Sequence, residues 1–319
     1  MNLEDAIAGF LACKRALARK YHSEEAELRL LARFAAARGA SRLEDLTPAL
    51  LDEFLASRAR TTPRSFNHLP GAVSCLLDWA VSQQMLQAAP LQAHRRRATA
   101  ARIPFLLGPD QARQLLHAAR ALPDGTRSPG RGVTYHAIFA LCYGLGLRGG
   151  EACALRAGDI DRDRELLIVK GGKFGKTRLI PHGPRISELI GQQLARRAQD
   201  GRLPGDAPLF TFNGRTCVSR HSASTVFTGL VRDLGFAVPD GSSPPRLHCL
   251  RHSFAVGCLL RWYRQGIDPA GRLPHLSTFM GHVDPVSTAV YLTITPALLE
   301  QASRRFEALA EPAWTAAAP

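Results

Sequence analysis

A short basic stretch divides this chain into two segments of helical periodicity. Residues 93–105 carry Arg95, Arg96, Arg97 and Arg102 and no acidic residue. On either side, apolar residues recur at spacings of three and four, the period of a helix packed on a core. A chain of 319 residues is long enough for two cores. The sequence therefore predicts two domains, over residues 1–92 and 106–310, joined by a basic linker over 93–105 and followed by a flexible tail over 311–319.

The first segment is predicted to be entirely helical. Thr47-Pro48 has the capping side chain and the following proline of a helix start, and Ser23 precedes acidic residues suited to a first turn. The expected helices span residues 3–20, 23–38, 47–60 and 63–84.

In one part of the second segment, the apolar residues follow the pattern of β-strands instead of helices. Residues 165–170 and 176–181 are short β-like runs, and the glycine-rich residues 171–175 between them suit a hairpin turn. Helical patterns surround this hairpin, one of them over residues 273–280. An amphipathic helix is expected from Thr295, with Leu299 and Phe306 on its apolar face. The fold class is therefore mainly α, with a small antiparallel β-sheet in the second domain.

The charge favours a polyanionic partner. The formal net charge is +14, and the first 94 residues are nearly neutral, so the linker and the second segment carry the excess. Such a field attracts nucleic acid, although a merely soluble basic protein would share the composition. Arg64 and Asn67 on the fourth helix and Arg95, Arg96 and Arg97 in the linker are candidates for DNA contact. A solvated helix face is an equally good account of Arg64 and Asn67.

Cysteine usage and hydropathy argue against several classes of protein. The seven cysteines are scattered and never form Cys-x-x-Cys, so neither a disulfide framework nor a zinc site is expected. The chain contains no run of about 18 apolar residues and no signal-peptide pattern at its start. We expect a cytoplasmic protein with no metal, no other cofactor and no membrane partner.

The residues with the clearest chemistry lie in the second segment. A phosphodiester can be broken without a metal by a nucleophile, cations on the non-bridging oxygens, and a proton donor for the leaving oxygen. This chain has candidates for each part. In chain order they are Arg148 with Glu151, Lys173, His248 with Arg251, His282 and Tyr291.

Each candidate has the chemistry that its expected role requires. Arg148 and Arg251 have the planar fork that binds two phosphate oxygens, and both stay protonated. Lys173 can protonate the departing 5′ oxygen. His248 lies three residues before Arg251, on the same helix face, and can act as acid or base near the nucleophile.

Tyr291 is the expected nucleophile, and His282 is expected to donate another hydrogen bond to the phosphate. Of the five tyrosines, only Tyr291 follows a Gly-His pair by this spacing, nine positions after His282.

This ordered set resembles the signature of the tyrosine recombinases, the phage integrase family. The resemblance runs from about residue 105 to residue 306, and the helical segment over 1–92 is similar to the family's SAM-like core-binding domain. It implies a C-shaped clamp of two domains around double-stranded DNA and a covalent 3′-phosphotyrosine intermediate. It also implies strand exchange in a homotetramer on paired sites, with a partner recombinase or DNA-bending factor as an open question.

Three departures or ambiguities accompany the resemblance. Gly149 stands where the family usually has an apolar residue. The interval from Arg251 to Gly281 is long, which resembles members carried by transposons and plasmids. Lys170 and Lys176 remain alternatives to Lys173, because the choice rests on aligning the strand after the turn.

Ordinary explanations exist for every one of these residues taken singly. An arginine and a glutamate at helical spacing can be a surface pair, and a tyrosine can be half-buried packing. Their conjunction favours a site-specific recombinase. A type IB topoisomerase and a non-catalytic DNA-binding accessory protein remain the alternative function classes. The sequence predicts structural roles for His252 and Ser253 and a packing role for Cys249.

Overall fold

The computed structural model describes residues 1–91, 96–97, 102–171, 177–198, 203–282, 284, 286–293 and 296–315. Contacts divide the chain into two compact units, Met1–Ala101 and Arg102–Pro319. Arg95, Lys173 and Lys176 lie outside the described residues. No helix of the described part has the length and apolar character needed to cross a bilayer.

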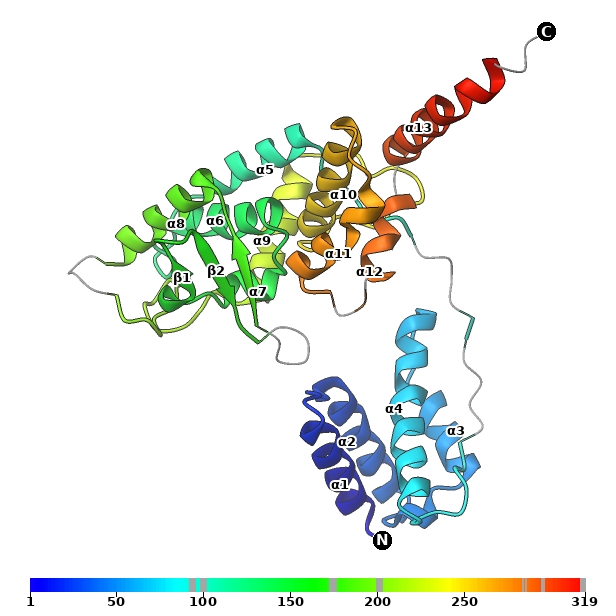
Figure 1. The fold of residues 1–319 in the computed structure, drawn as a ribbon. Helices are drawn as coiled ribbons and strands as arrows, with labels where there is room; N and C mark the ends of the chain where they lie inside the picture. Colours follow the sequence, from blue (N-terminus) through cyan, green and yellow to red (C-terminus); the bar gives the residue numbers. More distant parts are fainter. Residues whose placement is uncertain are drawn as a thin grey trace. The chain divides into compact units, whose positions relative to one another are not determined.

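The first unit is built from helices joined by short turns and loops, and its last helix ends at Ser82 (Figure 1). Thr47 and Thr62 accept hydrogen bonds from the backbone N–H groups of Leu50 and Ser65, and a proline follows each cap, so the predicted start at Thr47 is confirmed. The elements are α1 (Leu3–Ala16), α2 (His22–Ala36), the 3-10 turn η1 (Leu43–Asp45), α3 (Pro48–Ala56) and α4 (Pro63–Ser82).

The predicted start at Ser23 is wrong in detail. Helix α2 begins at His22, and the residue before it, Tyr21, has left-handed backbone torsions and makes no side-chain cap. The Tyr21 ring packs edge-on against Phe10, with 5.8 Å between the ring centroids. A tertiary contact therefore decides this helix start in place of the local capping preference.

The core of the first unit contains one paired acid. Phe10 and Phe54 are fully buried among leucines of all four helices. Glu27 is buried beside them, and its carboxylate lies 3.2 Å from Arg60 and 2.9 Å from Nδ1 of His68. These partners replace the water that burial removes from the carboxylate.

The second unit contains the sheet and most of the helices. Its helices are α5 (Pro109–Arg120), α6 (Arg131–Gly144), α7 (Gly149–Cys153), the 3-10 turn η2 (Ala157–Asp159), α8 (Pro184–Arg197), α9 (Arg220–Asp233), α10 (Cys249–Arg264), α11 (Pro269–Met280), α12 (Val286–Ala289), the 3-10 turn η4 (Val290–Thr293) and α13 (Pro296–Thr315). Helix α13 continues to Thr315, so the first residues of the expected flexible tail are helical.

The two predicted strands are confirmed, whereas residues 172–175 of the expected turn lie outside the described residues. Strand β2 (Leu166–Val169) pairs antiparallel with β3 (Arg178–Pro181), with Val169 opposite Arg178, and the short β1 (Ile160–Asp161) pairs with the other edge of β2. The fold is thus mainly α with a small antiparallel sheet, as the sequence predicts.

Two apolar clusters organise the second unit. The larger one surrounds α6, which packs against α5, α8 and α10 (Figure 1). The smaller one joins α10 and α11 to the segment that follows them, and it includes Leu259, Met280, Tyr291 and Leu298, all buried. The expected nucleophile is therefore part of a hydrophobic core.

Helix α11 begins four residues earlier than predicted and ends beside the site. Asp268 caps it by accepting from the backbone N–H of Ala270, and Pro274 is tolerated inside it. Gly281 ends the helix with φ +68°, and a Cβ there would lie 2.8 Å from a guanidinium nitrogen of Arg178. Only glycine fits both the left-handed torsion and the close approach.

We expect Gly281→Ala to lower the free energy of unfolding by at least about 1–2 kcal/mol, because left-handed torsions strain an alanine and the new methyl group meets Arg178. Urea unfolding of both proteins measures this difference. Gly271→Ala is the matched control, since that helical glycine has open space around its Cβ position and alanine raises helix propensity by up to about 1 kcal/mol. Equal effects of the two substitutions would contradict the explanation.

Candidate active site

Five of the six predicted catalytic residues converge in the second unit. Arg148 precedes α7, His248 and Arg251 lie at the start of α10, His282 follows α11, and Tyr291 lies on η4. The rings of His282 and Tyr291 stack with 6.4 Å between centroids. The predicted lysine lies outside the described residues.

Glu151 holds Arg148 in place. The carboxylate of Glu151 accepts hydrogen bonds from the Arg148 guanidinium at 2.7 Å and from the Arg148 backbone N–H at 2.9 Å. The guanidinium also donates to the carbonyl of Gly281 at 3.0 Å. The supporting role predicted for Glu151 thus has a geometric basis, because its carboxylate fixes both the main chain and the side chain of the arginine.

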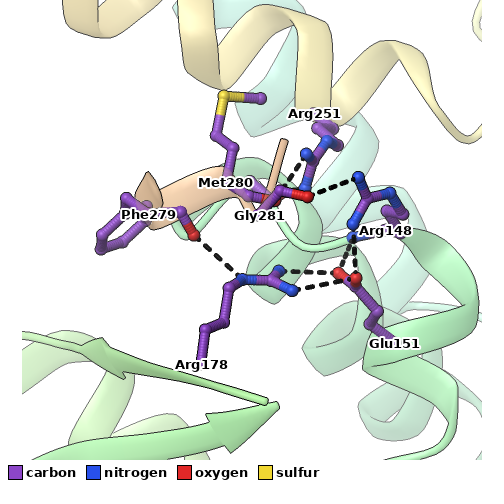
Figure 2. Close-up of polar contacts among 8 residues, drawn as sticks. Arg148, Glu151, Arg178, Arg251, Phe279, Met280 and Gly281 are labelled. Atoms are coloured by element: carbon purple, nitrogen blue, oxygen red, sulfur yellow. Dashed lines mark hydrogen bonds and ion pairs between the residues drawn. The ribbon is translucent and has the colours of Figure 1, made fainter. Parts of the chain in front are cut away.

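Arg178 is a component of the site that the sequence does not reveal. Both terminal nitrogens of its guanidinium donate to Glu151, at 2.8 and 3.0 Å, and its Nε donates to the carbonyl of Phe279 (Figure 2). The sequence places Arg178 on a strand and gives no sign of the helix that it faces. Strand β3 is thereby tied to α7 and to the end of α11.

The two arginines determine the ionisation of Glu151. Burial favours the neutral acid, but the hydrogen bonds and positive charges of Arg178 and Arg148 outweigh it and lower the pKa of Glu151 to about 2. The carboxylate is therefore charged at every physiological pH.

Arg251 is a buried cation. Its side chain is 1% exposed, and it donates to the carbonyls of Gly146 and Met280, each at 2.6 Å. Burial and the nearby charge of Arg148 lower its pKa to about 10, so it remains protonated at neutral pH. No described residue pairs with its Nε. A buried charge with neutral partners and an unpaired donor is suited to binding an anion.

Three histidines lie beside these cations. Burial, followed by the charges of Arg251 and Arg148, lowers the pKa values of His248 and His282 to about 4. Burial and the neighbouring His248 do the same for His252. All three rings are therefore neutral at pH 7 when the site holds no anion.

His282 and Tyr291 each have a specific partner. Nδ1 of His282 lies 2.7 Å from the hydroxyl of the buried Thr288, which fixes the ring orientation. The Tyr291 hydroxyl lies 2.7 Å from Nδ1 of His252. The sequence predicts a structural role for His252 and does not reveal that its ring contacts the expected nucleophile.

Tyr291 is 4% exposed, and burial raises its pKa while the charges of Arg251 and Arg148 oppose the shift. The phenol is thus protonated at neutral pH. Burial also makes its hydroxyl dependent on a hydrogen-bond partner.

Among the described residues, no group of histidine, cysteine or acidic side chains has the arrangement of a metal site. What the described cluster offers is three guanidinium groups, one carboxylate shared by two of them, three neutral imidazoles and one buried phenol. Guanidinium groups bind phosphate oxygens, and a phenol can attack phosphorus once it loses its proton.

Comparison with known proteins identifies the family of this chain. The profile of the phage integrase family matches residues 106–297. The chain belongs to the phage integrase family.

Family members from bacteria are similar in sequence. The protein y4rB of Sinorhizobium fredii, an integrase/recombinase candidate, is 38% identical over 206 residues, which are 64% of this chain and 66% of that one. The tyrosine recombinase XerC of Xanthomonas campestris pv. campestris is 28% identical over 270 residues, 83% of this chain and 75% of its own. The chain thus spans slightly less than two thirds of y4rB and three quarters of XerC.

Solved family structures share the fold. The Tn1549 transposon integrase, solved in complex with transposon right end DNA, superposes with a TM-score of 0.66 at 17% identity, over 97% of this chain and all of that chain. XerA recombinase superposes with a TM-score of 0.50 at 20% identity, over 95% and 98% of the two chains.

Gly149, which departs from the usual family pattern, has a steric explanation. A Cβ at this position would lie 2.5 Å from the side chain of Leu247, so the glycine leaves room for the residue before His248. The departure therefore brings the start of α10 close to the start of α7.

The predicted DNA-contact residues lie in the first unit. Arg64 is exposed on α4. The Asn67 amide exchanges two hydrogen bonds with the backbone of Arg96, at 2.7 and 2.8 Å, and the Arg96 guanidinium covers the ring of Phe66 at 3.9 Å. Asn67 thus fixes the linker backbone, while Arg97 is exposed. DNA contact by these residues stays a prediction.

The ionisation of Glu151 predicts a pH-dependent contribution to stability. Its pKa falls from 4.5 to about 2 in the folded protein, and each pKa unit is worth about 1.4 kcal/mol, so the carboxylate contributes about 3 kcal/mol. Because the folded pKa is depressed, this contribution is present above about pH 5 and is lost as the pH falls towards 2.

We expect Glu151→Gln to remove the pH-dependent contribution of this carboxylate to stability. The unfolding free energy of the variant should therefore fall less steeply than that of the wild type between pH 5 and 2. Urea unfolding across that range is the measurement. Glu188→Gln, at an exposed position on α8, should follow the wild-type slope. Parallel curves for the wild type and Glu151→Gln would show that the arginines do not hold this carboxylate.

Proposed function

We propose that this protein is a site-specific DNA recombinase that breaks and rejoins strands through a covalent 3′-phosphotyrosine intermediate. The proposal rests above all on the Tyr291 hydroxyl, which is buried in the same cluster as the charges of Arg148 and Arg251. A phenol beside two fixed cations is suited to attack a phosphodiester and poorly suited to a purely structural task.

In the proposed cleavage step, the Tyr291 oxygen forms a bond to phosphorus and loses its proton, while the bond from phosphorus to the 5′ oxygen breaks. Arg148 and Arg251 bind the non-bridging oxygens, where charge accumulates in the transition state. The free Nε of Arg251 supports this role, because it is a buried donor without a described partner. His282, oriented by Thr288, supplies a further hydrogen bond.

Lys173 is proposed to protonate the departing 5′ oxygen. Lys170, the first alternative, has its Nζ 2.7 Å from the buried carboxylate of Asp159. That ion pair holds Lys170 beside η2. It therefore favours Lys173 over Lys170 as the proton donor. His248, whose ring packs against that of His252, is proposed as a further acid or base of the site.

Double-stranded DNA is the proposed partner, in a homotetramer on paired sites. The solved Tn1549 and lambda integrase structures are complexes with DNA, the latter as a dimer on a core site. On α13, Leu298 is buried in its own unit, whereas Leu299 and Phe306 are 51% and 65% exposed. We propose that these exposed residues dock on a neighbouring subunit.

The covalent step is tested first. The protein selects its half-site from a random-sequence duplex library, and a nick placed beside that half-site gives a suicide substrate. We expect Tyr291→Phe to bind this DNA as the wild type does and to form no denaturant-stable adduct, because only the attacking oxygen is removed. Tyr263→Phe, at a half-buried tyrosine of α10, is the matched control and should form the adduct. An adduct with Tyr291→Phe would overturn the assignment.

The same half-sites on plasmids separate the three function classes. A recombinase should yield products only when two sites are present. Relaxation of a plasmid with a single site, without recombinants, would identify a type IB topoisomerase. Binding without any adduct would identify an accessory protein.

A separate experiment tests which lysine protonates the departing 5′ oxygen. A 5′-bridging phosphorothiolate gives a sulfur leaving group that departs without a proton, so it should restore cleavage to Lys173→Ala. Lys170→Ala and Lys176→Ala are controls, which should not gain from sulfur. If one of them is the variant that sulfur rescues, the proton donor is that lysine.

A further inference from the structure

The Tyr291 hydroxyl has a single described partner, and it is not the histidine expected from the sequence. Nδ1 of His252 lies 2.7 Å from the hydroxyl, with 5.5 Å between the two ring centroids. Both side chains are largely buried, so water is a poor competitor for this contact.

His248 contacts His252 rather than the tyrosine. Their rings lie one helical turn apart on α10 and meet edge to face, with 4.6 Å between centroids. The imidazole next to the phenol is therefore His252, and His248 lies behind it.

We infer that His252 is a catalytic residue that accepts the proton of Tyr291 when DNA is cleaved and returns it when the strand is rejoined, an inference that rests on the proposed function. The geometry suits the transfer, because a general base must lie about 2.6–3.2 Å from the oxygen that it deprotonates. A merely structural histidine would not need its ring nitrogen on the nucleophile.

The transfer balances without any further reactant. The O–H bond of Tyr291 breaks as an N–H bond forms at Nδ1 of His252, and the freed electron pair of the oxygen forms the bond to phosphorus. The pair of electrons from the breaking bond leaves with the 5′ oxygen, which takes its proton from Lys173. Rejoining reverses each step.

The surroundings of His252 explain why its imidazole is neutral before it accepts the proton of Tyr291. It faces His248 and Arg251 from its own helix and Tyr291 from η4. Burial and the first two of these lower its pKa to about 4. A DNA phosphate on Arg251 adds negative charge to the site, which stabilises the imidazolium during transfer. The base is thus free to accept a proton and gains strength when the substrate binds.

The rate of adduct formation on the nicked half-site duplex tests the inference. We expect His252→Ala to be about 10²–10⁴-fold slower at pH 7, with unchanged DNA affinity. Its deficit should shrink as the pH rises towards 9.5, because tyrosinate then forms without a base. His252→Asn keeps an acceptor near the position of Nδ1 but takes no proton, so it should be as slow as the alanine variant. His275→Ala, at an exposed position on α11, should match the wild type.

Three results would overturn the inference. A near wild-type rate for His252→Asn would leave His252 a positioning residue. A deficit that is equal at all pH values would make it structural. Rescue by the 5′-bridging phosphorothiolate would place it on the leaving-group side, where Lys173 is expected to act.

A ¹⁵N histidine spectrum of the wild type keeps the test valid even if the variants fail to fold. Nδ1 of His252 should carry no proton at pH 7, and its resonance should move in Tyr291→Phe; a protonated Nδ1 would overturn the inference. Adduct formation by the wild type is scored separately, so failure of this inference and failure of the proposed function are distinguishable.

Discussion

The shared carboxylate of Glu151 is the interaction on which the rest of the site depends. It binds Arg148 and Arg178 together, and these two arginines also reach the carbonyls of Gly281 and Phe279. The start of α7, strand β3 and the end of α11 are therefore joined at one buried point. Because a half-satisfied buried network costs more than an apolar core, each of these contacts depends on the others.

The site stays positively charged, because the three arginines Arg148, Arg178 and Arg251 outnumber the one carboxylate of Glu151. Glu151 is already shared by two arginines, and Arg251 has carbonyl partners among the described residues and no carboxylate. Burial keeps the three histidines neutral, so the charge of the site comes from guanidinium groups, which hold their protons throughout the physiological range. A site of this kind is suited to attract a phosphate at any such pH, and its neutral imidazoles are able to accept or donate hydrogen bonds.

The sequence predicts those features of the site that depend on local spacing. Arg148 and Glu151 are three residues apart and do interact, and the two β-like runs do pair as antiparallel strands. Contacts between distant elements are not predicted. Arg178 faces α7 across the fold, and His252 reaches the nucleophile only because η4 packs on α10. Residue spacing specifies neighbours on one helix, whereas tertiary packing selects the partner from another element.

The position of Tyr291 depends on anchors on both sides of it. Before it, the buried Thr288 binds His282, and after it, the buried Leu298 joins the same apolar cluster as the tyrosine ring. The next residue, Leu299, is exposed on α13. A surface that covers α13 therefore acts on a helix whose first turn is packed beside the nucleophile. In the proposed tetramer, this short connection would make the geometry of the phenol depend on whether a neighbouring subunit is present.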